Sequence, residues 1–562
     1  MIKGLVIIPA RGGSKGIPRK NVRLLGDKPL IFYSIAIGKQ LAASIPGIDV
    51  VVSSEDPLIL EITNFYGVES VKRPPELSHD SVTLDPVVKH AVECMEEHKK
   101  EKYDVIITLQ PTSPLLKWET LKLALEKFIN SQLDTLISAV EKKHLFWVKG
   151  DNGIKPFYSE RKNRQFLDPI YWEAGAFLIS RRELIDRGTR IGNRVGVFPL
   201  GDIEGLDIDQ WYDWILAESF LNRRKIVFRV EGDRNIGLGH VYRCLTLAEK
   251  FIAHEVTFLM KEELGISKVK EHNFKVVTFS REDEILKIID EINPDIVIND
   301  ILDTSEEYVK QLKERDIFIV NFEDLGEGAR YADIVFNALY EWSGIDQENV
   351  YYGYKYECLR ETFYLFPVKE KPRKRVKNIL ITFGGTDPND LTRRVLNVLR
   401  KAEIRNVLIN VILGLGYKKR DEIISLAGKM REEGINVKVL EDVPFISRFM
   451  FEADFLITSN GRTVYESVSL GTPAISISQN FREATHLFSR ICPGVINLGL
   501  ATEIDDEDIK TAIMKLMDNY EVRKTMQQSL KEYAMEIRKG IERIETIIFE
   551  RYKEKRLDGG RS

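Results

Sequence analysis

The chain has 562 residues, of which 43% are hydrophobic and 30% charged, and its formal net charge is −4. At roughly 150 residues per domain, this length predicts three or four globular units, each with its own core. The charge balance provides no basic face for nucleic acid, so we expect no polynucleotide partner. The four cysteines, Cys94, Cys244, Cys358 and Cys492, form no CxxC pair. They indicate neither a zinc site nor a disulfide framework, and a reducing cytoplasm fits best.

The N-terminal segment does not read as a targeting signal. The apolar run near the N-terminus, residues 5–9, is only about five residues long, far short of the ~20 that span a bilayer. We therefore expect no signal peptide, no membrane helix and a cytoplasmic location.

Short apolar strands alternate with amphipathic helices along nearly the whole chain. In the first part, the strand-like runs are 5–9, 50–53, 105–109 and 135–140, and the helical patterns are 86–98, 119–129 and 214–221. A basic tetrad at 222–225 precedes new strands at 226–230, 256–260, 296–299 and 318–321, and a polar segment at 369–375 precedes another at 378–383. This rhythm predicts an α/β protein, with one open, mainly parallel sheet followed by two Rossmann-like lobes. The predicted domains are residues 1–222, 225–368 and 376–552, with 553–562 as a disordered tail.

The most informative stretch is residues 8–21, IPARGGSKGIPRKN, where the first strand ends and a loop opens. Its glycines, Gly12, Gly13 and Gly16, let the backbone approach a ligand closely. Its cations include Arg11, Lys15 and Lys20, which suit a triphosphate. The GxxxxGK[ST] spacing of a P-loop is absent. The alternative is a solvated glycine loop with incidental charge.

This loop, together with residues 73–80 (RPPELSHD) and 109–115 (LQPTSPL), resembles the CMP-sialic acid synthetase family over nearly all of residues 1–221. The resemblance implies CTP-dependent activation of an acidic nine-carbon sugar to its CMP-sugar, with release of pyrophosphate. It also implies a catalytic role for Lys20 and nucleotide contacts from Arg11, Gly12, Gly13, Ser14, Lys15, Asn21, Arg73 and Gln110.

The family's metal pair falls on residues 206–209, LDID. Alternation along a short extended segment puts Asp207 and Asp209 on one side. Two carboxylates suit Mg²⁺, although a polar strand-ending loop is the alternative. The family usually has Asn-Gly after an aromatic segment, whereas this chain has Ala174 in YWEAGA (171–176), so its contacts to the acidic sugar are expected to differ.

The second half has its own signature at residues 229–248, a strand, a glycine loop and an apolar-periodic helix. It holds no complete GxGxxG fingerprint, which disfavours a nicotinamide site. His240 stands between glycines and the helix start, where a functional role is favoured over a structural one.

This stretch, with residues 350–363, 383–388 (FGGTDP) and 460–466 (NGRTVYE), resembles the UDP-sugar hydrolase family of pseudaminic acid biosynthesis over about residues 225–551. The resemblance implies a GT-B fold and release of a free acetamido sugar and UDP, with no cofactor. His240 would then activate water, and Glu466 would bind the ribose. The other residues implied to bind the nucleotide are Gly239, Gly384, Gly385, Thr386, Gly461 and Thr463. Asp300 and Glu231, at neighbouring strand ends, are the next candidates for the base.

Two other hypotheses for the second half remain: it is a GT-B glycosyltransferase, or it is a non-catalytic sensor of nucleotide sugars. Asn460 and Arg462 stand where the family typically has small residues, and 479–483 (QNFRE) follows its pattern only in part. The expected partners are CTP, an acidic nine-carbon sugar and a UDP-sugar. A homodimer formed through the N-terminal domain is kept as an open alternative.

Overall fold

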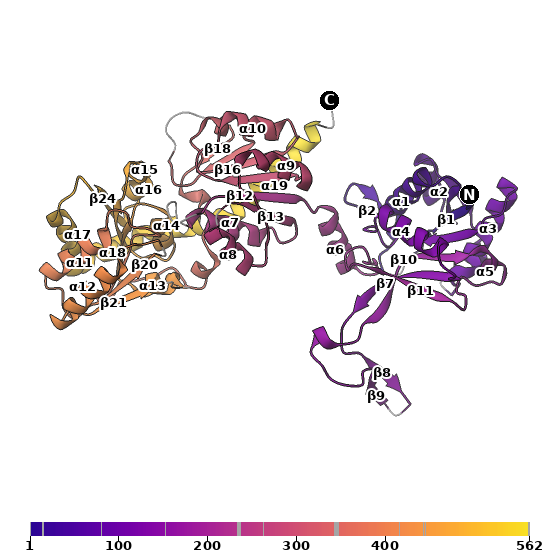
Figure 1. Cartoon of the computed structure of the whole chain (residues 1–562), viewed down its shortest axis with the longest axis horizontal. Coiled ribbons are helices and arrows are strands. Elements are labelled where there is room, and N and C mark those ends of the chain that lie inside the picture. Colours follow the sequence, from indigo (N-terminus) through magenta and orange to yellow (C-terminus); the bar gives the residue numbers. More distant parts are fainter. Residues whose placement is uncertain are drawn as a thin grey trace. The chain divides into compact units, whose positions relative to one another are not determined.

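The computed structural model describes residues 2–13, 16–79, 81–151, 153–232, 238–261, 263–341, 348–414, 416–441, 443 and 445–559. The chain forms two compact units, residues 1–223 and 224–562 (Figure 1). The division falls at the basic tetrad where the strand pattern of the sequence restarts.

The first unit is built on a seven-stranded sheet in the order β11-β7-β10-β6-β1-β4-β5. The sheet is mainly parallel, and β10 runs antiparallel to both of its neighbours. The strands are β1 (Gly4–Pro9), β4 (Ile48–Ser54), β5 (Glu69–Lys72), β6 (Val105–Leu109), β7 (Thr135–Lys142), β10 (Ile170–Arg181) and β11 (Val195–Leu200). The helices are α1 (Leu30–Ser44), α2 (Pro57–Phe65), α3 (Leu84–Lys99), α4 (Trp118–Ile129), α5 (Arg182–Asp186) and α6 (Trp211–Leu221).

Strand β1 shows why helices cover both faces of this sheet. All its residues are buried, and successive side chains point to opposite faces. Val6 and Ile8 pack in one core with residues of α1 and α4. Leu5 and Ile7 pack in another with residues of α3 and α5. A continuous apolar run is therefore what this doubly covered, largely parallel sheet requires.

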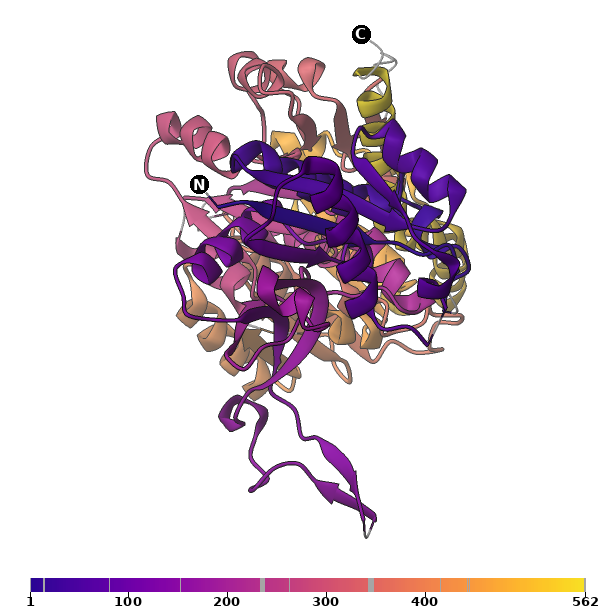
Figure 2. The same ribbon diagram turned by 90° about the vertical axis from the view of Figure 1, so that its right-hand side faces the viewer.

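Two small hairpins accompany the first sheet, β2 (Leu24–Leu25) with β3 (Lys28–Pro29), and β8 (Trp147–Gly150) with β9 (Gly153–Pro156). The second hairpin projects from its unit as an arm in both ribbon views (Figure 1, Figure 2). The sequence did not predict this arm, because its four-residue strands carry little periodic signal.

The second unit has two fully parallel sheets. The first has the order β14-β13-β12-β15-β16-β17-β18. Its strands are β12 (Lys225–Val230), β13 (Glu255–Met260), β14 (Lys275–Thr278), β15 (Ile296–Asp300), β16 (Phe318–Phe322), β17 (Ile334–Asn337) and β18 (Val350–Tyr352). Its helices are α7 (Gly239–Lys250), α8 (Glu263–Glu271), α9 (Ile285–Ile292) and α10 (Glu306–Lys313).

The other sheet has the order β21-β20-β19-β22-β23-β24. Its strands are β19 (Asn378–Thr382), β20 (Leu408–Leu413), β21 (Val437–Glu441), β22 (Phe455–Ser459), β23 (Ala474–Ser478) and β24 (Val495–Leu500). The helices here are α11 (Leu391–Lys401), α12 (Arg420–Glu432), α13 (Ile446–Glu452), α14 (Arg462–Ser469), α15 (Phe481–Ala484), α16 (Phe488–Ile491), α17 (Asp506–Asp518) and α18 (Tyr520–Arg538). The predicted α/β class with two Rossmann-like lobes is confirmed.

The last helix, α19 (Gly540–Gly559), packs against the first lobe of the second unit. Ile541, Ile544 and Ile548 are buried in one core with β12, α7 and β15, and Figure 1 shows the yellow helix among these elements. Full burial of each such side chain contributes about 1.5–3 kcal/mol. Residues 540–552 thus lie against the first lobe, not with the second lobe to which the sequence assigned them. Residues 553–559, expected to be a disordered tail, continue the helix. Among the helices described, none is long and apolar enough to cross a membrane.

Each sheet has a topological switch point where strand order reverses, and ligands of open α/β sheets bind there at the carboxyl ends of the strands. In the first unit this point lies between β1 and β6. In the two lobes of the second unit it lies between β12 and β15, and between β19 and β22. The residues selected from the sequence gather at these three edges.

Candidate functional site

The first unit has a cavity of about 320 Å³ at the switch point between β1 and β6. Its lining comes from segments far apart in sequence: the loop after β1, the segment after β5, the loop after β6 and the segment before α6. Of the residues selected from the sequence, the lining includes Arg11, Gly13, Lys20, Asn21, Arg73, Gln110, Asp207 and Asp209. Ser14 and Lys15 lie outside the described residues.

The three glycines of the loop differ in how much space surrounds them. A Cβ added at Gly12 would lie 2.3 Å from Asp56 Oδ2, and one at Gly16 would lie 2.2 Å from the backbone oxygen of Asp209. Gly13 faces open space. The resemblance implied a nucleotide contact from Gly12, whereas the Gly12 N–H donates to Glu55 Oε1 at 2.7 Å. The backbone of Asp209 therefore requires glycine at position 16, whereas a side chain at position 12 would require the Asp56 side chain to shift.

Lys20 and Asn21 begin a short 3-10 turn (Lys20–Val22) and are both buried. The Lys20 ammonium donates to the Ile208 carbonyl and lies 3.4 Å from Asp209 Oδ1. The Asn21 amide donates to the Arg11 carbonyl at 2.9 Å, and its Oδ1 is buried without a hydrogen-bond partner among the described residues. These contacts tie the glycine loop to the acidic segment across the cavity.

Arg73 is held rigidly beside the cavity. Its guanidinium is buried and donates to the Ser53 carbonyl at 2.7 Å, with Glu55 Oε2 at 3.8 Å. Burial lowers the pKa of Arg73, and Glu55 partly opposes this. Because the partners of Arg73 lie at the end of β4, the arginine presents a fixed cation to the cavity.

The two aspartates flank the buried Ile208, whose N–H donates to the Thr112 carbonyl at 2.8 Å. Burial raises the pKa of Asp207, with a contribution from Asp209, while a hydrogen bond from Thr112 lowers it. Asp207 Oδ1 is buried without a hydrogen-bond partner among the described residues. This orphaned oxygen fits a cation. No group of three or more His, Cys, Asp or Glu side chains suited to a metal occurs in the described ranges, so the remaining ligands would be phosphate and water oxygens.

Ala174, which departs from the family pattern, is buried in β10 and is followed by Gly175. Gly175 has φ +68°, and a Cβ there would lie 3.2 Å from Asp207 Oδ2 and 3.3 Å from Gln110 Nε2. The strand register of β10 shifts between Glu173 and Leu178. The backbone of β10 therefore closes over these two side chains at this point.

Several lining residues were not selected as sites: Ser78, His79, Pro111 and Thr112. All four lie within the two stretches that carry the family resemblance, so the signal was present. Glu55 was also missed. It follows β4, which pairs directly with β1, and this adjacency could have placed it at the same edge.

In the second unit, His240 lies at the start of α7 and meets the end of β15. Its Nδ1 is hydrogen-bonded to Asp300 Oδ1. Asp300 is fully buried and also accepts two hydrogen bonds from Arg243, at 2.6 Å each. Burial opposes ionisation of Asp300, but Arg243 and His240 outweigh it and hold its pKa below the usual range. An ionised carboxylate only accepts, so Nδ1 carries the proton and Nε2 is left as the basic nitrogen.

Arg243 links this pair to Glu323, at the end of β16. Its NH1 donates to Glu323 Oε1 at 2.9 Å. Glu323 is buried, and the N–H groups of Ala338 and Leu339 also donate to its carboxylate, at 3.2 Å each. Burial raises the pKa of Glu323 to about 7, against the effect of Arg243. Glu231, the other alternative base, is half-buried, and burial raises its pKa too.

The glycine turns of the second lobe meet at the switch point between β19 and β22. Gly384, Gly385 and Thr386 follow β19, where Gly384 has φ +75°. A Cβ at Gly414 would lie 2.3 Å from the Gly384 carbonyl, so β20 closes tightly against this turn. Gly461 is the N-cap residue of α14, and Thr463 lies in its first turn.

Glu466, also on α14, accepts two hydrogen bonds from Arg360, at 3.1 and 2.8 Å. The expected ribose contact would therefore share this carboxylate with an arginine. The two lobes approach at this edge, because Arg462 of α14 donates to the backbone carbonyl of Gly239 at 2.8 Å. Gly239, His240 and the α14 turn are thus brought together.

The fold and these edges define an α/β protein with a polar nucleotide-sized cavity in its first unit. A family model described as cytidylyltransferase matches residues 5–165. Pseudaminic acid cytidylyltransferase of Campylobacter jejuni is 38% identical over 183 residues, which cover 31% of this chain and 77% of that protein. The chain belongs to the cytidylyltransferase family.

Two further matches are broader in extent. Uncharacterized protein MJ1062 of Methanocaldococcus jannaschii is 36% identical over 272 residues, 46% of this chain and 56% of that protein, so the chain spans little more than half of its length. The solved structure of the glycotransferase of kitacinnamycin covers 59% of this chain and all of that chain, with a TM-score of 0.44 and 14% identity. This similarity is too low to inform activity, and the two parallel sheets of the second unit themselves define its two lobes.

Proposed function

We propose that the first unit transfers CMP from CTP to an acidic nine-carbon sugar of the sialic or pseudaminic type. The supporting observation is that one cavity gathers Arg11, Lys20, Arg73 and the two aspartates from three separate segments. Three cations suit the triphosphate, and the family and the name of its Campylobacter jejuni relative agree with this substrate class.

In the proposed reaction, the anomeric hydroxyl oxygen of the sugar attacks the α-phosphorus of CTP. The bond from the α-phosphorus to the bridging oxygen breaks, pyrophosphate leaves, and the hydroxyl proton passes to solvent. Arg11, Lys20 and Arg73 hold the phosphates and offset their charge. Asp207 and Asp209 would hold Mg²⁺, which when bound supplies charge neutralisation and lowers the pKa of the attacking hydroxyl.

The test is release of pyrophosphate from CTP and a nonulosonic acid, with and without Mg²⁺. Asp207→Ala and Asp209→Ala should abolish the Mg²⁺-dependent rate. Asp202→Asn is a matched control, because Asp202 is a nearby exposed acid that pairs with Lys142 and does not line the cavity. Full activity of both alanine variants in excess chelator would remove the metal assignment.

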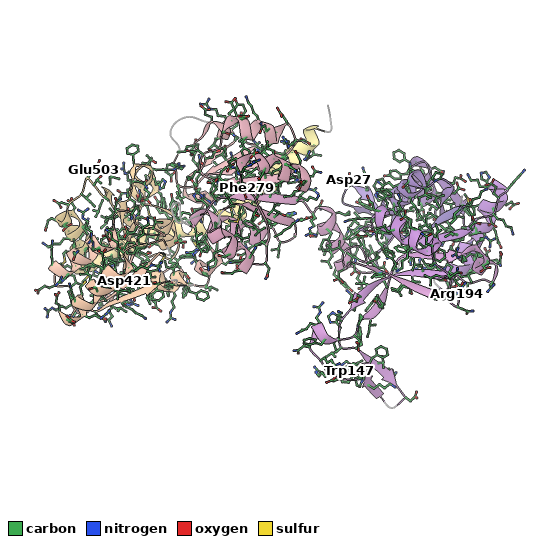
Figure 3. The ribbon with its side chains drawn as sticks, viewed as in Figure 1. Asp27, Trp147, Arg194, Phe279, Asp421 and Glu503 are labelled. Carbon is green, nitrogen blue, oxygen red and sulfur yellow. The ribbon has the colours of Figure 1, made fainter. Side chains whose placement is uncertain are left out.

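We also propose that the first unit forms a homodimer through its β8–β9 arm. An isolated two-stranded hairpin is marginally stable in water. The arm nevertheless exposes Trp147 (55%), Ile154 (75%) and Phe157 (58%), and Figure 3 labels Trp147 on it. Sedimentation of the full chain should give a dimer that Trp147→Ser with Ile154→Ser converts to a monomer. A monomeric parent chain would refute this.

For the second unit, we propose hydrolysis of a UDP-linked acetamido sugar to the free sugar and UDP. A water oxygen attacks the anomeric carbon, the bond from that carbon to the diphosphate oxygen breaks, and His240 Nε2 takes the water proton. Asp300 fixes the ring and stabilises the imidazolium that forms. The free N–H groups at the α14 start and the Gly384–Thr386 turn would hold the departing diphosphate.

The observation that supports hydrolysis is the His240–Asp300 pair at the switch point, beside the α14 turn. Incubation of the full chain with UDP-acetamido sugars and no acceptor should release UDP and free sugar in equal amounts. Turnover only with an added acceptor would indicate a glycosyltransferase. Binding without turnover, combined with altered CMP-sugar formation, would indicate a sensor.

A further inference from the structure

Arg462 occupies an unusual place at the junction of the two lobes of the second unit. It is the first residue of α14, the helix whose start is proposed to hold the diphosphate. Its side chain is 17% exposed and is directed toward the other lobe, not toward solvent. The family that this half resembles typically has a small residue at this position, so Arg462 is a departure from the family pattern.

Every nitrogen of the Arg462 guanidinium has a partner. Nε donates to Glu357 Oε1 at 2.8 Å, NH1 to the Gly239 carbonyl at 2.8 Å and NH2 to the Cys358 carbonyl at 2.6 Å. Glu357 and Cys358 are fully buried. A planar fork of this kind satisfies three acceptors in fixed directions, which a lysine ammonium does not.

The contact with Gly239 has a direct consequence for His240, the next residue in the chain. Asp300 holds the His240 imidazole through Nδ1. The hydrogen bond from Arg462 to the Gly239 carbonyl holds the backbone that precedes His240. His240 belongs to the first lobe, whereas the proposed diphosphate site belongs to the second. Displacement of reacting groups by about 1 Å lowers the rate on the order of 10²-fold. Hydrolysis therefore depends on how precisely His240 of the first lobe is placed relative to the diphosphate site of the second lobe.

We infer that Arg462 is a positioning residue. It holds the start of α7, which carries His240, in a fixed position relative to the start of α14, which is proposed to hold the diphosphate. It acts through the Gly239 carbonyl and not by contact with the reacting atoms. This inference rests on the proposed hydrolase function for its kinetic consequence. Its structural consequence, ordering of the α7 start, stands apart from any activity.

The test compares Arg462→Ala with Arg538→Ala in the full chain. Arg538 is a matched control because it also donates to three backbone carbonyls, those of Ser469, Phe363 and Phe366, and Ser469 ends the same helix. Arg462→Ala should lower the kcat of UDP-sugar hydrolysis about 10–100-fold with KM within about threefold. Arg462→Lys should recover only part of this loss, and Arg538→Ala should keep the parent kcat.

Hydrogen exchange over residues 238–245 provides the second readout. Exchange there should be faster in Arg462→Ala than in the parent and unchanged in Arg538→Ala. Equal kcat values for the two alanine variants would overturn the inference, as would a raised KM with unchanged kcat, which would make Arg462 a diphosphate ligand. Unchanged exchange in Arg462→Ala would also overturn it. If the parent hydrolyses no UDP-sugar, the proposed function fails and the exchange result alone decides the role of Arg462.

Discussion

Replacement of His240 by asparagine separates catalysis from structure in the second unit. General-base assistance contributes about 10²–10⁴-fold, so turnover of UDP-sugar hydrolysis should fall by that factor while substrate affinity stays within a few-fold. The substitution should lower the free energy of unfolding only slightly. Asp300 keeps both hydrogen bonds from Arg243 when the imidazole is removed. The loss is at most one bond to a charged group, about 1.5–3 kcal/mol, and the asparagine amide can replace part of it.

Kinetics and thermal unfolding should be measured on the same preparations of the full chain. His272→Asn is the matched control, because His272, an exposed residue just after α8, also pairs with a carboxylate, Glu249 Oε1 at 2.7 Å. The control should keep full turnover, and CMP-sugar synthesis should be unchanged in both variants. Hydrolysis at the parent rate in His240→Asn would refute the assignment and make Asp300 or Glu231 the next base to test.

Three further predictions follow from burial and close packing. Gly16→Ala should strongly raise the KM for CTP, because its Cβ would lie 2.2 Å from the Asp209 carbonyl, whereas Gly13→Ala, in open space, should fold normally; steady-state kinetics and calorimetry compare them. Asp300→Asn should destabilise the second unit by about 3–5 kcal/mol, because it leaves a buried arginine partly unpaired; an unchanged calorimetric transition would contradict this. The pKa of Glu323 is raised from 4.5 to about 7 in the folded chain, so folding favours the protonated carboxyl group. Its contribution to the free energy of unfolding is complete below pH 4.5 and is lost as the pH rises through 7. The free energy of unfolding of the second unit should therefore fall by up to about 3 kcal/mol from pH 5 to pH 8. Glu323→Gln should remove this dependence on pH.

The sequence predicted those parts of the sites that strand ends determine. Arg11, Arg73 and Gln110 each follow a strand of one sheet, and neighbouring parallel strands end at the same edge. Their common cavity was therefore predictable from the order of strands and loops. The alternation that placed Asp207 and Asp209 together also holds, with Ile208 buried between them.

Features that depend on packing between distant elements were not predictable. The amphipathic pattern of α19 indicates a buried face but not its partner, and that partner is the first lobe. Arg462 was noted only as a departure from a family pattern, because its three acceptors come from segments that approach only when the lobes are packed. Glu55 is a different case: it lies outside every recognised motif, but the pairing of β4 with β1 could have placed it at the same edge.

The most direct test of the account is mass spectrometry of the products that the full chain forms from CTP, Mg²⁺ and a panel of nonulosonic acids. We predict one acid that gives its CMP-sugar and pyrophosphate in equal amounts, with both products lost in Lys20→Ala. Formation of CDP or free CMP in place of a CMP-sugar, or no product from any nine-carbon acid, would contradict the assignment of the first unit.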